Sequence, residues 1–165
     1  MGNKTYVHPT ALIADNVVIE DGVYIGPYCV IGFPAEWRGK EDLENKGVLV
    51  KKGSRLTGLV TIDAGVDRMT TVGENCYLMK HTHVGHDAIL HDNVTLSCGA
   101  KVGGHSVIGK KTNIGLNAVI HQKLNIPEGC MIGASAFVGK KSTLKANHKY
   151  AGVPVKELGP NIIKK

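Results

Sequence analysis

The feature that most constrains the fold of this chain is a six-residue repeat of aliphatic residues. Every sixth residue from Val72 to Leu144 is Val, Ile or Leu, and an earlier block with the same spacing runs from Val7 to Ile31. A helix repeats its face every 3.6 residues and a plain strand every two residues. A period of six fits a short strand followed by a turn, repeated as the sides of a prism. We therefore expect an all-β chain of stacked short strands.

Residues at the same place in successive hexads form a column, and two columns besides the aliphatic one show a preference for one kind of residue. Glycine directly follows the aliphatic residue in many repeats, which suits a tight corner (Gly26, Gly32, Gly73, Gly85, Gly103, Gly109, Gly115, Gly133, Gly139). Small residues recur four places after the aliphatic residue, which suits a narrow interior, and three of the four cysteines (Cys29, Cys76, Cys130) fall in this column. We expect these three thiols to be buried, and Cys98, which breaks the column, to be exposed.

Charge is divided unevenly along the chain. Residues 1–100 carry 9 basic and 12 acidic side chains, a net charge of −3, whereas residues 101–165 carry 11 Lys against two Glu, a net charge of +9. The basic part should attract anions, and without aromatic interleaving it favours a phosphorylated small molecule or an acidic protein over nucleic acid. The chain has no CxxC pair and no apolar stretch long enough to span a bilayer, so we expect a reduced, cytoplasmic protein without an integral membrane segment.

The period and its columns resemble those of the hexapeptide-repeat acyltransferases. The resemblance implies a left-handed parallel β-helix with three hexads in each coil. We expect residues 1–149 to form this domain and residues 150–165 to form a C-terminal cap and basic tail. The pattern breaks at about residues 33–47, which we expect to be an extruded loop, either a solvated insertion or a flap over a site.

Six of the eight histidines lie between residues 81 and 121. In a coil of three hexads His86 would face Gly104, which has no side chain, and Asp87 would approach His105 on the next coil. Acyl transfer from a thioester needs a base for the acceptor proton and a donor for the oxyanion of the tetrahedral intermediate. An imidazole suits the first role, and a glycine N–H suits the second.

Three segments narrow the resemblance to the UDP-N-acetylglucosamine O-acyltransferases of lipid A synthesis. They are His83-Val84-Gly85-His86-Asp87, Gly104-His105 and His121-Gln122, spaced as in that family. The resemblance implies that His86 is the general base, Asp87 its supporting carboxylate and Gly104 the oxyanion donor. It implies substrate positioning by His83, His105, His121 and Gln122. It further implies a homotrimer, a nucleotide-sugar acceptor, and acyl carrier protein or CoA as the carrier of the acyl donor, with no bound cofactor and no metal.

Several alternatives stay open. The family has a Gln-Asp-Leu-Lys run in the loop where this chain has Pro34-Ala35-Glu36-Trp37-Arg38, so the acceptor sugar and the choice of hydroxyl or amine are undetermined. The family continues into a helical C-terminal domain that this chain does not show. The ending Tyr150-Ala151-Gly152-Val153-Pro154 instead resembles that of acetyl-CoA-dependent sugar acetyltransferases, and Lys140 and Lys141 would suit the phosphates of the donor.

Two further alternatives belong to other functional classes. A γ-type carbonic anhydrase shares the β-helix and has a His-x4-His pair like that of His86 and His91. Zinc catalysis needs three protein ligands, and this chain has Asp63 where the resemblance places the third histidine. A non-catalytic β-helix scaffold is the other alternative.

Overall fold

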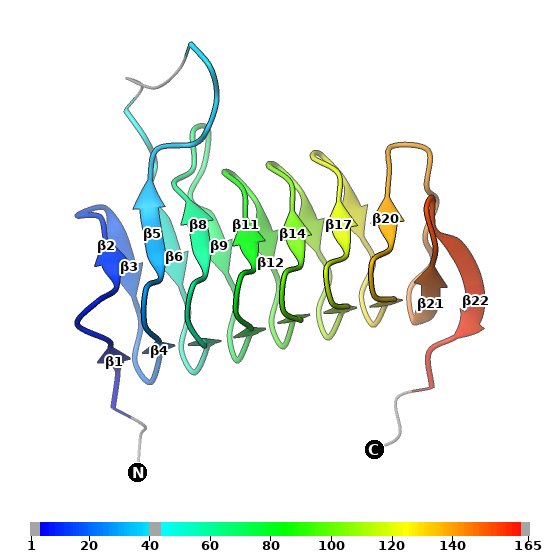
Figure 1. Ribbon diagram of the computed structural model, residues 1–165, viewed down its shortest axis with the longest axis horizontal. Helices are drawn as coiled ribbons and strands as arrows, with labels where there is room; N and C mark the ends of the chain where they lie inside the picture. Colours follow the sequence, from blue (N-terminus) through cyan, green and yellow to red (C-terminus); the bar gives the residue numbers. More distant parts are fainter. Residues whose placement is uncertain (1–3, 40–43, 163–165) are drawn as a thin grey trace.

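The computed structural model describes residues 4–39 and 44–162, which contain 22 β-strands and no helix. The strands form three sheets that wrap around one axis as the faces of a prism, with the coils stacked along its length (Figure 1). Each sheet is parallel except at the C-terminal end of the first. No helix in the described part is long and apolar enough to cross a membrane.

The strands are distributed over the sheets as follows. The first sheet contains β1 (Tyr6–Val7), β4 (Tyr24–Ile25), β7 (Arg55–Leu56), β10 (Tyr77–Leu78), β13 (Thr95–Leu96), β16 (Asn113–Ile114), β19 (Met131–Ile132), β21 (His148–Ala151) and β22 (Lys156–Pro160). The second contains β2 (Leu12–Ile13), β5 (Val30–Phe33), β8 (Thr61–Asp63), β11 (His83–Val84), β14 (Lys101–Val102), β17 (Val119–Ile120) and β20 (Phe137–Val138). The third contains β3 (Val17–Ile19), β6 (Val48–Val50), β9 (Thr70–Val72), β12 (Ile89–Leu90), β15 (Val107–Ile108) and β18 (Asn125–Ile126).

The strand register confirms the coil length expected from the resemblance. His83 pairs with Lys101, and Lys101 pairs with Val119, so each step to the next coil is three hexads. Three strands make one coil, and every strand from β10 to β18 follows this rule. The fold is thus a parallel β-solenoid, consistent with the predicted left-handed β-helix.

The aliphatic column forms the core. All of its members from Val72 to Val138 are at most 2% exposed, and Leu144 packs against the core from its end. Adjacent strand residues point to opposite faces, so in each two-residue strand from β4 to β20 the second residue is buried and the first faces outward. Because outward positions repeat once in each coil, a side chain placed there lies directly beside its counterpart on the next coil.

The small column also lies inside, as predicted. Cys29, Cys76 and Cys130 are buried, whereas Cys98 is exposed. Burial raises the pKa of the Cys76 thiol to about 11, so this thiol stays protonated and acts as a small apolar side chain. Thr112, a polar member of the column, donates its hydroxyl to the carbonyl of Pro127 at 2.9 Å, which satisfies it in the core.

Two segments lengthen the regular coil, and both lie between a second-sheet strand and a third-sheet strand. The first connects β5, which ends at Phe33, with β6, which begins at Val48, and its residues 40–43 lie outside the described part. The second is residues 64–69, between β8 and β9. The two insertions contact each other through an antiparallel bridge between Gly47 and Gly65. In Figure 1 both project from the same edge of the prism as the turns after β11, β14 and β17.

The C-terminal segment closes the far end of the solenoid. β21 continues the first sheet in parallel with β19, and β22 folds back antiparallel to β21. Tyr150 is buried, and its hydroxyl accepts the N–H of Lys145 at 2.7 Å. The last coil is therefore covered by a hairpin that joins its own sheet. The end of the predicted basic tail, residues 163–165, lies outside the described residues.

Candidate active site

Most of the candidate site residues lie in a series of turns that we call the site corner. These are the turns after β8, β11, β14 and β17, or residues 64–69, 85–87, 103–105 and 121–123. Asp87 and His105 have φ angles of 61° and 58°. Non-glycine residues at the equivalent place in other turns, such as Asn93, share this conformation, so it belongs to the fold and not to the site. The His105 N–H donates to the His86 carbonyl at 2.8 Å, which joins the two coils at the corner.

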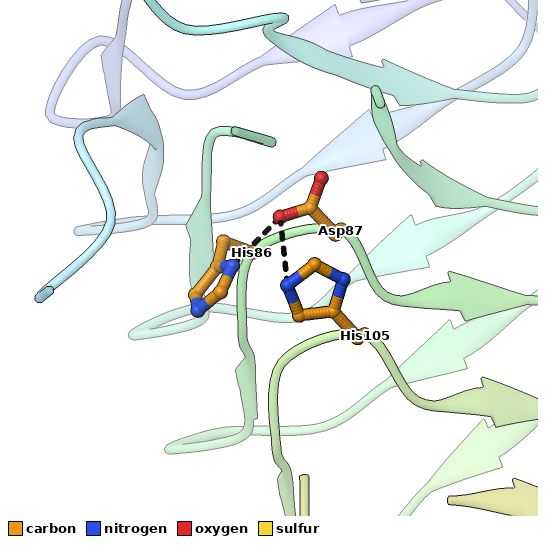
Figure 2. Close-up of side chains that lie close together, drawn as sticks. All are labelled: His86, Asp87 and His105. Carbon is orange, nitrogen blue, oxygen red and sulfur yellow. Dashed lines mark hydrogen bonds and ion pairs between the residues drawn. The ribbon is translucent and has the colours of Figure 1, made fainter. Parts of the chain in front are cut away.

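His86, Asp87 and His105 converge at this corner, as Figure 2 shows. His86 Nδ1 lies 2.7 Å from Asp87 Oδ2, and His105 Nε2 lies 3.6 Å from the same oxygen. Asp87 is fully buried, and the two imidazoles are 16% and 20% exposed. A carboxylate only accepts hydrogen bonds, so Nδ1 of His86 carries the hydrogen and Nε2 of the neutral ring keeps a lone pair. The expected approach of Asp87 to His105 is confirmed.

The second insertion holds Asp87 in place through its backbone. The N–H groups of Asp67 and Arg68 each donate to Asp87 Oδ1 at 2.8 Å, and the N–H of Val66 lies 3.1 Å from both carboxylate oxygens. Arg68 Nε donates to the Asp87 carbonyl at 2.8 Å, and the Asp87 N–H donates to Thr70 Oγ1 at 2.8 Å. These contacts fix both the side chain and the backbone of Asp87.

The same contacts determine the ionisation of Asp87. Burial acts to raise its pKa, but the hydrogen bond with His86 and the N–H groups of Arg68, Val66 and Asp67 favour the charged form and hold the pKa below its ordinary value. Asp63 shows the opposite balance, because burial raises its pKa and the nearby imidazoles of His83 and His86 only partly counter this. Asp87 is therefore the carboxylate that stays ionised beside the imidazole.

Gly104 lies directly against the His86 ring. A Cβ at this glycine would come 2.7 Å from His86 Nε2, closer than real Cβ atoms approach. Within residues 4–39 and 44–162, the Gly104 N–H donates to no carbonyl. His86 and Gly104 are thus neighbours, as predicted. The space between them combines the lone pair of His86 Nε2 with the available N–H of Gly104.

The first insertion covers His86 on another side. The indole of Trp37 stacks on the imidazole with ring centroids 5.4 Å apart and an interplanar angle of 28°. A pocket of about 250 Å³ opens beside this pair, and it is lined by Glu36, Trp37, His86, His105, Gln122 and Lys123. The loop therefore forms one wall of this pocket.

The remaining predicted residues lie outside this pocket. His83 faces outward from β11, with Nδ1 2.8 Å from Thr61 Oγ1 and Nε2 3.7 Å from Asp63 Oδ2. The His121 Nδ1 lies 3.0 Å from the Gln122 carbonyl. Lys140 and Lys141 line a different pocket of about 510 Å³, which also includes Phe137 and Val155.

The group His86, Asp87 and His105 is also the set of possible metal ligands within the described residues, with ligand atoms within 4.8 Å of one another. The oxygens of Asp87 already accept three N–H groups and the His86 ring. A metal ion would compete with these bonds, so the donor set fits a histidine–carboxylate pair better than a metal centre.

The six-residue period does not identify several residues that build the site, namely Trp37, Glu36, Lys123 and the backbone of residues 66–68. One signal of the second insertion is visible in the sequence, since the aliphatic column steps by ten residues from Ile62 to Val72. No residue pattern shows that this segment returns to Asp87.

Comparison with known proteins agrees with the repeat. The bacterial transferase hexapeptide (six repeats) family matches residues 1–33 and 69–104. The acyl-[acyl-carrier-protein]–UDP-N-acetylglucosamine O-acyltransferase of Campylobacter lari is 36% identical over 106 residues, which cover 54% of this chain and 40% of that protein. The chain spans 40% to 53% of the length of the curated relatives that it matches.

Solved structures show the same fold. The UDP-N-acetylglucosamine acyltransferase of Bacteroides fragilis superposes with a TM-score of 0.82 at 22% identity, over 96% of this chain and 62% of the other. A perosamine N-acetyltransferase from Caulobacter crescentus, in complex with CoA and GDP-perosamine, superposes with a TM-score of 0.61 at 17% identity, over 96% of this chain and 58% of the other.

Proposed function

We propose that this chain, a hexapeptide-repeat protein with UDP-N-acetylglucosamine O-acyltransferases among its sequence relatives, is an acyltransferase. It would transfer an acyl group from a phosphopantetheine thioester to a hydroxyl or an amine of a nucleotide sugar. The observation that carries this proposal is the His86 imidazole, whose Nδ1 binds buried Asp87 and whose Nε2 lies against Gly104.

His86 would act as the general base. Its Nε2 takes the proton of the acceptor hydroxyl or amine as that atom attacks the thioester carbonyl carbon. Asp87 stabilises the resulting imidazolium through its 2.7 Å bond to Nδ1. When the tetrahedral intermediate collapses, the carbon–sulfur bond breaks, and the thiolate leaves with the proton returned from His86.

Gly104 would supply the oxyanion donor. Its N–H has no backbone partner in the described part of the chain and belongs to the coil next to His86. A donor that is already in place lowers the energy of the developing oxyanion without reorganisation, and removal of one such donor from an enzyme costs about 100- to 1000-fold in kcat. His105 and Gln122 line the pocket beside it and would position the acceptor. We assign a positioning role also to His83 and His121, as the resemblance implies.

Donor binding is proposed at the basic pocket near the C-terminal end. Lys140 and Lys141 line it together with Phe137, Pro154 and Val155, so it combines positive charge with an apolar wall. This suits a phosphorylated pantetheine carrier, either CoA or an acyl carrier protein. The second candidate function, an acetyl-CoA-dependent sugar acetyltransferase, rests on this same pocket.

A donor and acceptor screen tests the function. The purified protein is incubated with UDP-N-acetylglucosamine and a panel of nucleotide amino sugars, each with acetyl-CoA or a hydroxyacyl carrier protein, and products are detected by mass spectrometry. We expect one combination to add an acyl group. Turnover with acetyl-CoA alone selects the second candidate, whereas no acyl transfer in any combination contradicts the proposal.

A matched pair of histidine variants tests the site. His86→Ala removes the base and should lower kcat by about 100- to 10,000-fold. His91→Ala changes an exposed histidine in the turn after β12 and should keep kcat within about twofold. Equal activity of the two variants would rule out His86 as the base.

We also propose that the protein acts as a homotrimer, as the resemblance implies. Light scattering of the eluting protein should give a mass three times that of the single chain. A monomer mass at the concentrations used in the assay contradicts this assignment.

A further inference from the structure

The first insertion carries the only tryptophan of the chain, and this residue contacts the proposed base. The ring centroids of Trp37 and His86 are 5.4 Å apart, and the two planes are inclined by 28°. Rings at this distance and angle are stacked, an arrangement that contributes free energy beyond the area it buries. Trp37 has no place in the mechanism above, so its position needs a separate explanation.

The backbone of the insertion directs Trp37 towards the site. Phe33, the last residue of β5, pairs with Asp63, and its carbonyl accepts the N–H of Ala64 at 2.8 Å. Ala35 is buried, and its carbonyl accepts the Trp37 N–H at 2.7 Å in a tight turn. The chain is therefore anchored on both sides of Pro34 before it reaches the indole, and Trp37 is not carried on a free loop.

The His86 imidazole is confined by its neighbours. Asp87 holds Nδ1 at 2.7 Å, and Gly104 lies against Nε2. His105 meets the ring edge-on, with centroids 5.0 Å apart and an angle of 85°. The Asp87 bond alone leaves the ring free to tilt about the line through Nδ1, so a contact on its face is needed to fix its plane. Trp37 provides that contact.

We propose that Trp37 is a positioning residue for His86: its indole fixes the plane of the imidazole and shields one face, so that the acceptor reaches Nε2 from the side bounded by Gln122 and Lys123. This inference rests on the proposed function in taking His86 as the base. The stack itself can be tested without any substrate, so failure of the inference and failure of the proposed function are distinguishable.

The substrate-free test uses tryptophan fluorescence, which reports on Trp37 alone. An imidazolium in contact with an indole quenches its emission much more than a neutral imidazole does. We expect the emission of the wild-type protein to fall as the pH is lowered from about 9 to about 5, the range in which histidines titrate. His86→Gln should abolish this fall.

Other titratable groups in the same pocket supply the controls. Glu36, His105 and Lys123 line it together with Trp37, so Glu36→Gln, His105→Gln and Lys123→Met are titrated in parallel. Each should retain the fall in emission. A fall that persists in His86→Gln, or that disappears only in one of the three controls, overturns the assignment of the stack to His86.

Kinetics then separate positioning from binding. Trp37→Ala should lower kcat by about tenfold with KM changed less than about twofold, because a poorly held base slows the chemical step without removing a substrate contact. Trp37→Phe keeps a stacking ring and should restore kcat to within about threefold of the wild type. An unchanged kcat in Trp37→Ala, or a loss that appears only in KM, contradicts the positioning role. Thermal unfolding of both variants shows whether a loss of kcat reflects a loss of fold.

Discussion

Two series of turns in the solenoid share one backbone conformation but differ in the contacts of their side chains. In the site corner Asp87 is buried, accepts the N–H groups of residues 66–68 and contacts two imidazoles. A second corner is formed by the turns after β9, β12 and β15, residues 73–75, 91–93 and 109–111. Its aspartate, Asp92, lies at the middle turn position, which His86 holds in the site corner. It accepts one N–H, from Glu74 at 3.1 Å, and its partly exposed carboxylate lies 3.3 Å from Lys110 Nζ. We call this second series the salt-bridge corner.

The difference shows where the chemistry of the site comes from. The β-helix supplies equivalent positions one coil apart at both corners, with a positive φ at the third residue of each three-residue turn. Only the site corner receives the two insertions, which bring buried N–H groups to Asp87 and an indole to His86. The repeat places the candidate site residues, and the interruptions of the repeat set their environment.

The largest effect expected from this comparison concerns stability. Asp87→Asn replaces one acceptor oxygen with an NH₂ group that faces N–H donors in a buried place, and should lower the free energy of unfolding by about 2–4 kcal/mol. Asp92→Asn removes a partly exposed ion pair and should lower the free energy of unfolding by about 0.5 kcal/mol. Urea unfolding of both variants measures the two losses. Similar losses in the two variants would mean that the N–H groups of the second insertion do not make Asp87 more important for stability than Asp92.

A smaller effect is expected where a side chain is added beside the imidazole. Gly104→Ala places a methyl group 2.7 Å from His86 Nε2, so the ring must move, and kcat/KM should fall by about 10- to 100-fold. Lys110→Ala, at the equivalent turn position of the salt-bridge corner, should leave kcat/KM unchanged. Steady-state assays with the productive donor compare the two variants. An active Gly104→Ala enzyme would show that the space beside Nε2 is not used.

The smallest effect expected is a dependence of stability on acid. The pKa of Asp87 is lower in the folded protein than its ordinary value of 3.8. The unfolded chain therefore binds the proton more readily, and the contribution of this group is fully present well above pH 3.8 and is lost as the pH falls through the lowered pKa. The stability difference between wild type and Asp87→Asn, measured by urea unfolding from pH 7 to about pH 3, should shrink on acidification. A constant difference would contradict the lowered pKa.

Much of the fold could be predicted because its rule is local. The aliphatic column and the glycine that follows it recur in each hexad, so strand positions, the interior and the three buried cysteines follow from spacing alone. The approach of Asp87 to His105 and of His86 to Gly104 follows from the same rule with a coil of three hexads. These contacts connect neighbouring coils, where sequence distance determines spatial distance.

The residues that the two insertions bring to the site are not placed by the six-residue spacing. Trp37 reaches His86 from 49 positions away, and Val66–Arg68 reach Asp87 from 19 to 21 positions away, after the period has been interrupted. Once a segment leaves the coil, its path depends on packing and backbone hydrogen bonds that spacing does not encode. The shift of the column between Ile62 and Val72 reveals the insertion but not its target.

The bridge between Gly47 and Gly65 makes the two insertions a single unit. The Lys46 N–H donates to the Gly65 carbonyl at 2.7 Å, and the Gly65 N–H donates to the Gly47 carbonyl at 3.0 Å. The end of the first insertion is therefore joined to the start of the second. Shortening either insertion would remove backbone hydrogen bonds that hold the other in place. Transplanting the site corner onto a different β-helix would therefore require both insertions to be moved together, with the spacing of the two coils that carry them.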